Sequence, residues 1–418
     1  MVWPMNLKIF LKQYIKMFAQ NCMLPIWYRV CCRRPVIPGL IVFADAHHDG
    51  RPENMELLYR QLEELNQSGA AKVSGKKSTA RQKRFILEEI YLDYQNHSPA
   101  AVLRHMFAFM KLYAQADCVV ICDNFLPVAS CKKRKGTRVI QLWHACGAFK
   151  KFGYDTADDI PSNYRGNVFK NTDLVTVSAE ACVQPFASAM RLPETCVRPL
   201  GVSRTDVYFQ KKWQEECRRE FYGKYPEAKG KKVVLWAPTF RGNPGAPELI
   251  GLDLKKLQEQ LGEEWLVLSR VHPHMHEKYK ETDCPIMTER LFPVIDVLIG
   301  DYSSLIFEYL LFDRPLVLYV PDLREYQEKR GFYLEFQEIP GFRVKKEEAL
   351  PMAVQQEYLA YRQENTYNKV QSDEMRIFRK QREQFLETYM GSCDGHATDR
   401  IVEYVLRLHD WQRKSGRK

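Results

Sequence analysis

The feature that most constrains this fold is a repeated unit: a short apolar run, then a polar loop, then a helical segment. Such apolar runs occur in both halves of the chain, at 40–46, 116–124, 139–143, 173–178, 231–240, 264–273, 296–304 and 314–322. Apolar strands that alternate with helices predict parallel sheets, because a crossover helix returns the chain between parallel strands. The sequence therefore predicts an α/β fold.

The length of 418 residues exceeds what one compact core usually holds, and it predicts two domains. We expect a basic segment at 1–34, an N-terminal α/β domain at 35–205, a C-terminal α/β domain at 206–390, and a C-terminal helix with a basic tail at 391–418. Within the first domain we expect a helix over 55–66, a loop over 69–84 and two helical stretches before residue 116. Residues 346–410 are charged and helical in tendency.

The N-terminal segment differs from the rest of the chain in its charge. Residues 1–34 supply +6 of the net charge of +10 and contain no acid. On a helical wheel of 5–18, one apolar face lies beside a row of lysines: Leu7, Phe10, Leu11, Tyr14 and Phe18, with Lys8, Lys12 and Lys16. This pattern is typical of an amphipathic helix on an anionic membrane surface, although a helix packed on its own protein is the alternative. No stretch reaches the roughly 20 apolar residues that a transmembrane segment needs. The remaining charge is nearly balanced, which argues against a nucleic-acid partner.

The cysteine pattern indicates neither a metal site nor a disulfide framework. Twelve cysteines are scattered along the chain, with one adjacent pair, Cys31 and Cys32, and no CxxC pair. Reduced cysteines fit a cytosolic compartment best. No carboxylate cluster indicates a fixed metal, and no cofactor is assigned; a Mg²⁺ ion loosely held with the substrate stays open.

Four polar stretches follow predicted strands, where parallel sheets bind their ligands. The first, 142–153, contains His144, Lys150 and Lys151. An imidazole can accept a proton near neutral pH, and the lysines suit a phosphorylated substrate. A histidine with a purely structural role is the alternative interpretation.

Two further stretches, 237–241 and 270–274, follow consecutive predicted strands of the second half. They contain Thr239, Arg241, Arg270 and His272. The planar guanidinium of arginine binds phosphate oxygens through paired hydrogen bonds. A salt bridge between the domains would explain one such arginine, but two in consecutive units favour a phosphate site.

The fourth stretch, 300–308, combines two serines with a carboxylate one helical turn later. Ser303 or Ser304 suits the start of a helix, whose free N–H groups attract an anion. Glu308 lies on the same face as Ser304, and we expect it to reach a ribose diol. A helix cap without a ligand is the alternative.

The order of these motifs, WHxxGxxKKxG, APTxR, RxHP and DYSSxxFE, resembles the CDP-glycerol glycerophosphotransferase family of teichoic acid synthesis. The segments IVFADAHHDGRPENMELLY (41–59) and DLREYQEKRGFY (322–333) agree, and the resemblance runs from about residue 38 to about 390. Where the best-known members have Gly-Thr-Pro after the motif histidine, this chain has Ala145-Cys146-Gly147. The chain is similar to the shorter, priming type.

The resemblance implies a GT-B architecture, in which two Rossmann-like domains face each other across a cleft. It implies that the C-terminal domain binds CDP-glycerol and that the N-terminal domain receives a lipid-linked acceptor. A C-terminal helix would cross back onto the first domain. The implied reaction transfers glycerol phosphate to a hydroxyl of an undecaprenyl-linked saccharide and releases CMP, at the cytoplasmic face of the plasma membrane.

Within this architecture, positions after the predicted strands assign roles to single residues. His144 would take the proton of the attacking hydroxyl, and His272 would assist the leaving phosphate. The predicted donor-binding residues are Ser178, Arg204, Thr239, Arg241, Arg270, Ser303, Ser304 and Glu308, and the predicted acceptor- or phosphate-binding residues are His47, Lys150 and Lys151.

Three alternatives remain at this stage. A CDP-ribitol ribitolphosphotransferase and a nucleotide-sugar glycosyltransferase of the same fold would use similar loops. A non-catalytic basic protein of the membrane surface is the alternative from a different class.

Overall fold

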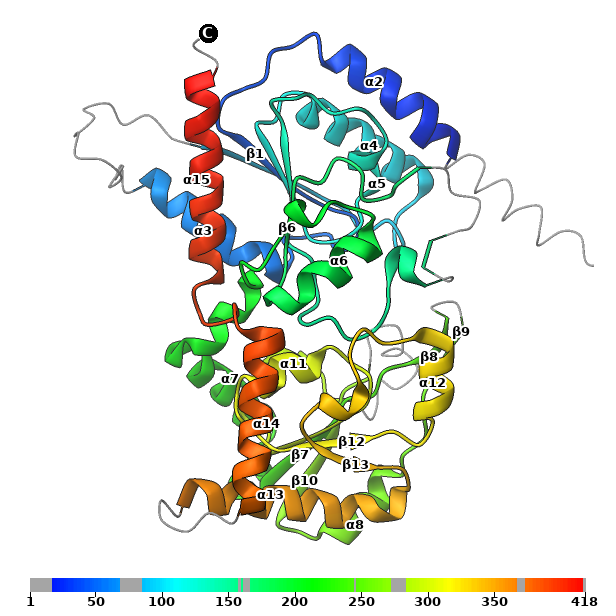
Figure 1. The fold of residues 1–418 in the computed structure, drawn as a ribbon, viewed down its shortest axis with the longest axis vertical. Coiled ribbons are helices and arrows are strands. Elements are labelled where there is room, and N and C mark those ends of the chain that lie inside the picture. The colour runs from blue at the N-terminus through cyan, green and yellow to red at the C-terminus, as the bar shows by residue number, and fades with distance from the viewer. Residues whose placement is uncertain are drawn as a thin grey trace, which may run out of the picture.

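The computed structural model describes residues 17–67, 85–156, 159–160, 166–243, 246–271, 283–366 and 373–415. Two parallel sheets dominate it, one in each half of the molecule (Figure 1). The first has the order β2-β1-β3-β4-β5-β6: β1 (Leu40–Asp45), β2 (Ile86–Tyr91), β3 (Cys118–Ile121), β4 (Arg138–Gln141), β5 (Leu174–Thr176) and β6 (Val197–Arg198). The second has the order β10-β7-β11-β12-β13: β7 (Lys232–Trp236), β10 (Trp265–Ser269), β11 (Val297–Gly300), β12 (Leu316–Tyr319) and β13 (Phe342–Val344). The predicted α/β fold with two Rossmann-like halves is confirmed.

Helices cover both faces of each sheet, so the central strands are apolar on both sides. Every residue of β1, β3, β11 and β12 is buried. The helices are α2 (Leu24–Cys31), α3 (Glu53–Gln67), α4 (Pro99–Tyr113), α5 (Leu126–Ala129), α6 (Val183–Met190), α7 (Lys211–Lys224), α8 (Leu254–Leu261), α10 (Thr288–Leu291), α11 (Leu305–Leu310), α12 (Leu323–Arg330), α13 (Leu350–Thr366), α14 (Asp373–Met390) and α15 (Ala397–Ser415). A short antiparallel ribbon, β8 (Arg241–Asn243) with β9 (Ala246–Glu248), follows β7. The loops that contain the predicted site residues follow the carboxyl ends of these strands.

Strand β2 corrects the prediction of two helical stretches before residue 116. The structure has one strand and one helix there, β2 and α4. Strand β2 pairs with β1 at the edge of the sheet, and Ile86 keeps 43% of its surface exposed. Glu88 and Glu89 interrupt its apolar pattern, because a half-covered edge strand tolerates charge.

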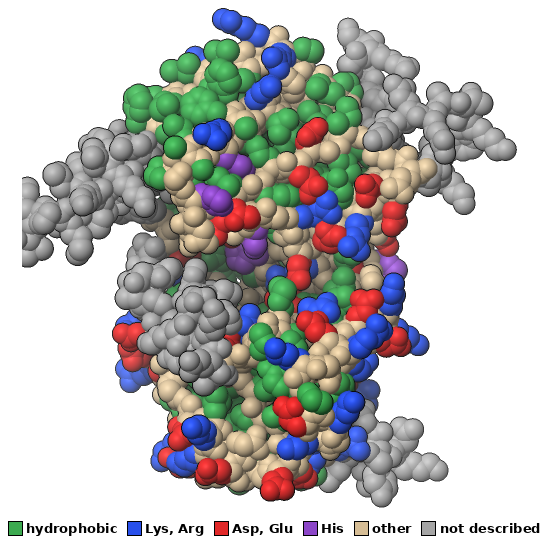
Figure 2. All heavy atoms as spheres, turned by 180° about the vertical axis from the view of Figure 1, so that it is seen from behind, with side chains coloured by type: hydrophobic (Ala, Val, Ile, Leu, Met, Phe, Trp, Pro, Cys, Tyr) green, Lys and Arg blue, Asp and Glu red, His purple; other side chains and the backbone are tan. Residues whose placement is uncertain are grey.

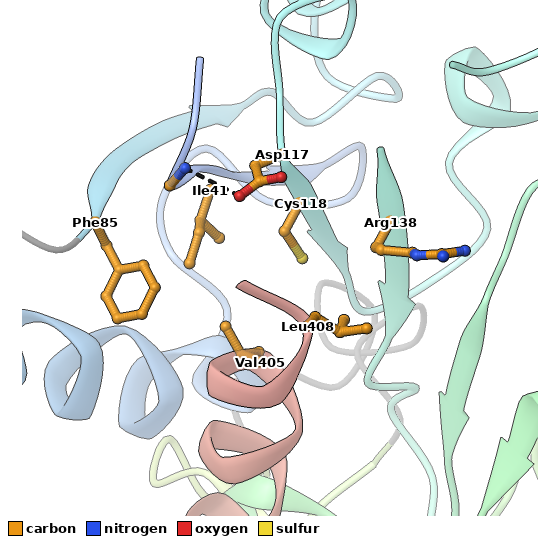
Figure 3. A pocket seen from close by; sticks show the side chains of 8 residues that line it. Ile41, Phe85, Asp117, Cys118, Arg138, Val405 and Leu408 are labelled. Atoms are coloured by element: carbon orange, nitrogen blue, oxygen red, sulfur yellow. Dashed lines mark hydrogen bonds between the residues drawn. The ribbon is translucent and has the colours of Figure 1, made fainter. Parts of the chain in front are cut away.

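The C-terminal helices tie the two halves together. In Figure 1, α14 runs beside the second sheet and α15 continues along the first half. The hydroxyl of Ser178, after β5, donates to the carbonyl of Tyr389 in α14 at 2.7 Å, and the N–H of Ser392 donates to the carbonyl of Ser178 at 2.9 Å. Helix α15 then covers the amino-terminal ends of β1, β3 and β4. Figure 3 shows Val405 and Leu408 of this helix closing a small pocket of about 10 Å³ beside Asp117.

A second link is a strand-like pairing between residues 149–151 and 331–333. The N–H of Lys151 donates to the carbonyl of Gly331 at 3.1 Å, and the N–H of Tyr333 donates to the carbonyl of Phe149 at 2.8 Å. The Phe149 ring packs on Phe332 with 4.9 Å between centroids and belongs to the core of the second half. The loop after β4 is thereby held by both halves.

The predicted helix over 5–18 lies almost entirely outside the described residues. From Met17 the chain is helical through a π-helical turn (Ala19–Met23) into α2, which packs on α4. Its inward side chains are Leu24, Tyr28 and Cys31, whereas Phe18 and Ile26 are 59% and 63% exposed. Among the described helices, none is long and apolar enough to cross a membrane.

Candidate active site

A cavity of about 660 Å³ lies where the carboxyl ends of the two sheets meet. Its wall includes the loops after β3 and β4 of the first sheet, and the loops after β7, β10 and β11 of the second. A volume of this size lies within the usual range for small-ligand pockets, about 300–1,000 Å³. Figure 2 shows the hollow between the halves, with histidine side chains gathered on the upper half near it.

The loop after β4 presents His144 in a fixed orientation. Trp143 adopts a left-handed backbone conformation, with φ +56°, which turns the chain sharply after the strand. Its N–H donates to Gln141 at 3.1 Å and its carbonyl accepts from Asn54 at 2.9 Å. The indole then stacks on the His144 ring, with 4.6 Å between the centroids.

Asp123 is the partner of this imidazole, and the sequence analysis missed it. Its Oδ1 accepts the N–H of Asn124 at 2.5 Å, while its Oδ2 lies 3.2 Å from Nδ1 of His144 and 3.9 Å from Nε2 of His47. Burial acts to raise the pKa of the Asp123 carboxyl, but His144 and His47 outweigh it and lower the pKa to about 2. An ionised carboxylate on Nδ1 favours the tautomer with the proton on Nδ1, which leaves Nε2 as a proton acceptor.

His47 belongs to this group but does not line the cavity. Its N–H donates to Asp45 at 2.7 Å, and Nδ1 of His48 lies 2.8 Å from the same carboxylate oxygen. Asp45 itself is buried at the end of β1. The predicted role of His47 in binding the acceptor stays a prediction.

Gly147 lets the loop after β4 pass close to helix α11 of the second half. Its φ is +67°, and a Cβ at this position would lie 2.4 Å from the ring of Phe307 in α11. Its N–H donates to the hydroxyl of Ser178 at 2.9 Å. Ser178 therefore braces the catalytic loop against α14 and is absent from the cavity wall, contrary to its predicted placement in the donor site.

Lys150 lines the cavity, whereas its neighbour Lys151 does not. No described residue forms an ion pair or hydrogen bond with the Lys150 ammonium group. Burial lowers the pKa of this group to about 8, helped by the positive charges of Arg330 and Arg241 and opposed by Asp301. A half-buried cation without a partner is suited to receive an anion.

The APTFR segment forms a network behind the cavity wall. Thr239 lines the cavity, and its N–H and hydroxyl both donate to Asp301, the hydroxyl at 2.7 Å. Arg241 donates to Asp301 at 2.9 Å and to Asp322 at 2.7 Å, and its guanidinium lies 4.7 Å from the centre of the Tyr302 ring. Arg241 is absent from the cavity wall, and its guanidinium donates to these two carboxylates. Its predicted role in donor binding stays a prediction.

A second buried network corrects the placement of Glu308. Its carboxylate is fully buried, bonded to the guanidinium of Arg204 and accepting the Tyr208 hydroxyl at 2.5 Å. Glu308 therefore does not reach the cavity; it fixes Arg204, which does. Nη1 of Arg204 makes no hydrogen bond to a described residue and remains available to an anion.

Arg270 and the two serines lie in the cavity wall. Arg270 donates to the buried carboxylate of Asp283 at 2.8 Å and to the carbonyl of Cys284 at 2.9 Å. Helix α11 begins directly after Ser304, and the Ser303 hydroxyl accepts the N–H of Leu305 at 3.3 Å. The helix start predicted from the serines is therefore present at the cavity.

The predicted residues that the structure brings together in the cavity wall are His144, Lys150, Arg204, Thr239, Arg270, Ser303 and Ser304. His272 lies outside the described residues. Asp123 and Glu289 were not predicted, although the carboxylate two residues after the buried strand β3 could have indicated the former. In the described part of the chain, no group of three or more His, Cys, Asp or Glu is arranged to hold a metal ion.

Comparison with known proteins identifies the family. The model of the CDP-glycerol:poly(glycerophosphate) glycerophosphotransferase family matches residues 26–407. The chain belongs to this family. It is therefore a phosphotransferase enzyme, as the motif order implied.

Relatives of the family act on two different polyol phosphates. The chain is 37% identical to the teichoic acid ribitol-phosphate primase of Bacillus spizizenii over 325 residues, 73% of this chain and 79% of the relative. It is 30% identical to the teichoic acid glycerol-phosphate primase of Bacillus subtilis over 309 residues, 69% of this chain and 74% of the relative. A solved structure of a variant of the wall teichoic acid polymerase TagF covers 100% of both chains with a TM-score of 0.67 and 17% sequence identity, which supports the two-domain fold.

Proposed function

We propose that this enzyme transfers glycerol phosphate from CDP-glycerol to a hydroxyl of an undecaprenyl-linked saccharide and releases CMP, in the synthesis of teichoic acid or a related wall polymer. One observation carries the proposal: the cavity brings an oriented imidazole and the cations Lys150 and Arg204 together with Arg270 and hydroxyls from the second half. An acceptor and an anionic donor can thus meet within one enclosed site.

His144 is the general base of the proposed reaction. Nε2 takes the proton of the acceptor hydroxyl, and Asp123 stabilises the imidazolium that forms. The hydroxyl oxygen bonds to the phosphorus that carries glycerol, and the bond from that phosphorus to the oxygen of CMP breaks. His272, which follows the cavity residue Val271 in the sequence, is proposed to donate a proton to the departing CMP phosphate.

Lys150, Arg204 and the two serines are proposed to hold the donor pyrophosphate. Two of these groups carry donors without partners among the described residues, Nζ of Lys150 and Nη1 of Arg204. Charge development in phosphoryl transfer is met mainly by such fixed positive groups. The same TagF variant was also solved after a soak with CDPG, which supports a CDP-polyol donor for this family.

The first experiment measures product formation directly. Purified enzyme is incubated with a lipid-linked disaccharide and either CDP-glycerol or CDP-ribitol, and CMP release and product mass are followed. We expect CMP and a product heavier by glycerol phosphate, and a loss of about 10²–10⁴ in rate for His144→Ala. His396→Ala, at an exposed histidine paired with Asp399, is the matched control. Exclusive use of CDP-ribitol would refute the glycerol assignment, and no CMP release with either donor would refute the function.

We further propose that the N-terminal segment docks on an anionic membrane. In the described part of this segment, the outward side chains Phe18, Ile26 and Val30 are 59%, 63% and 41% exposed. Arg29 and Arg33 are exposed beside them, and residues 1–34 contain no acid. Apolar side chains rimmed by basic groups suit an interfacial helix, where each basic residue contributes about 1 kcal/mol on an anionic surface.

Liposome sedimentation tests this docking. The pair Ile26→Glu and Val30→Glu should release the enzyme from vesicles that contain anionic lipid, with turnover on a soluble acceptor unchanged. Leu359→Glu, at a residue of α13 that is 54% exposed, controls for the loss of any surface apolar group. Equal sedimentation of the pair and the control would contradict membrane docking through this face.

A further inference from the structure

The cavity wall contains three carboxylates among its described residues, and two of them already have a partner. Asp123 lies against His144, and Asp159 pairs with Arg330 at 2.8 Å. Glu289 is the third. Its side chain forms no hydrogen bond or ion pair with another described residue. Apart from the backbone N–H of Glu289 itself, this partly buried carboxylate has no hydrogen-bond partner among the described residues.

The backbone holds Glu289 firmly at the cavity. The segment that precedes it is anchored to the end of β10, since the N–H of Cys284 donates to the carbonyl of Ser269 at 2.8 Å. The residue that follows, Arg290, points to the other side and donates to Glu220 at 2.5 Å. Helix α10 therefore presents Glu289 and Thr288 to the cavity from a fixed position.

The surrounding charges indicate what this carboxylate can bind. Burial raises the pKa of Glu289, Arg204 lowers it, and the neighbouring carboxylates of Glu308 and Glu53 add to the rise. Arg204 binds Glu308 through Nε and Nη2, and no hydrogen bond links it to Glu289. A second anion such as a phosphate would be repelled here, whereas hydroxyl groups donate hydrogen bonds without adding charge.

We propose that Glu289 binds a vicinal diol of the donor, accepting one hydroxyl on each carboxylate oxygen. This proposal rests on the proposed function, because a CDP-polyol brings two such diols, that of the ribose and that of the polyol. It replaces Glu308, whose carboxylate is fully buried against Arg204 and Tyr208, as the residue that recognises hydroxyls. Glu289 would thus secure the uncharged part of the donor, while Lys150 and Arg204 hold its phosphates.

Calorimetry with three ligands tests the proposal and shows whether Glu289 binds the ribose diol or the polyol diol. CDP-glycerol carries both diols, CMP carries only the ribose diol, and 2′-deoxy-CMP lacks one ribose hydroxyl. Glu289→Ala should weaken CDP-glycerol binding about ten- to hundredfold, because a hydrogen bond to a charged group is lost. Glu289→Gln keeps the shape of the side chain and should lose less. Glu259→Gln, on the exposed face of α8, is the matched control and should bind all three ligands normally.

The pattern across ligands identifies the diol. If Glu289 binds the ribose diol, Glu289→Ala also weakens CMP binding. It then removes the preference of the wild type for CMP over 2′-deoxy-CMP. If the polyol is bound, CMP affinity is unchanged and only CDP-glycerol weakens. Affinities of both Glu289 variants within twofold of the wild type for every ligand would overturn the proposal while leaving the proposed function standing. A wild-type enzyme that binds none of the ligands would refute both.

Discussion

Replacing Lys150 by methionine should weaken CDP-glycerol binding about ten- to hundredfold near neutral pH. The side chain lines the cavity and its ammonium group has no partner among the described residues, so its charge is available to a donor phosphate. The loss of one charged hydrogen-bond partner costs about 1.5–3 kcal/mol, which corresponds to that range. Lys151→Met is the matched control, because it removes the same charge one residue away and outside the cavity wall.

The pH dependence of this binding gives a second, independent measure. Burial, together with Arg330 and Arg241, lowers the pKa of Lys150 to about 8 in the free enzyme. Binding of an anion favours the protonated form, so affinity is full below this pKa and falls as pH rises through it. The protonated fraction falls about tenfold between pH 7 and pH 9, and donor affinity should fall by the same factor. Each phosphate of the donor carries one ester and one anhydride bond, and its single acidic group stays ionised across this interval.

Isothermal titration calorimetry in buffers of different ionisation enthalpy measures both quantities. At pH 8 the wild type should take up about half a proton on binding, since half of the Lys150 side chains are then unprotonated. Lys150→Arg stays charged throughout and should show a flat pH profile with no uptake. A Lys150→Met enzyme with the affinity and the pH profile of the wild type would refute the reasoning.

Three further predictions follow from the contacts of the site. Asp123→Asn should lower turnover strongly with unchanged donor affinity, because the imidazole loses the carboxylate that fixes its tautomer; rates and calorimetry on one preparation decide this. Gly147→Ala should lower both the melting temperature and turnover, since its Cβ would lie 2.4 Å from Phe307 at a positive φ; equal melting curves would contradict it. Glu308→Ala should destabilise the fold by about 3–5 kcal/mol in urea unfolding, because the Arg204 guanidinium stays buried without its anion; a loss below about 1 kcal/mol would count against this buried pair.

The sequence predicted the central strands of each sheet and the edge strand β10, but it missed the edge strands β2, β6 and β13. Buried central strands are continuous apolar runs, so β1, β3 and β11 could be recognised directly. Strand β2 lies at an edge with Glu88 and Glu89 within it, and such a segment has no clear apolar pattern. Its place in the sheet depends on pairing with β1, which is a long-range contact.

The sequence predicted which loops form the site, but it did not predict which side chains pair with one another. The loops after the predicted strands form most of the cavity wall, because the carboxyl ends of parallel strands meet at one edge of a sheet. Whether a polar side chain faces a ligand or another side chain depends on residues that are distant in sequence. Arg241 meets Asp322, 81 residues away, and Glu308 meets Arg204, 104 residues away, so both were assigned to the donor. Asp123 was overlooked for the same reason, since its importance comes from His144.

The pairing of 149–151 with 331–333 has a consequence for how the enzyme fails when heated. Phe149 is only 3% exposed and fills the core of the half that lies across the cavity. Separating the halves would uncover this ring and leave a hole where it packed on Phe332. Calorimetric melting should therefore show a single cooperative transition for the whole chain, and heat inactivation should coincide with it rather than precede it. Either half expressed without the other should fail to reach a stable native state.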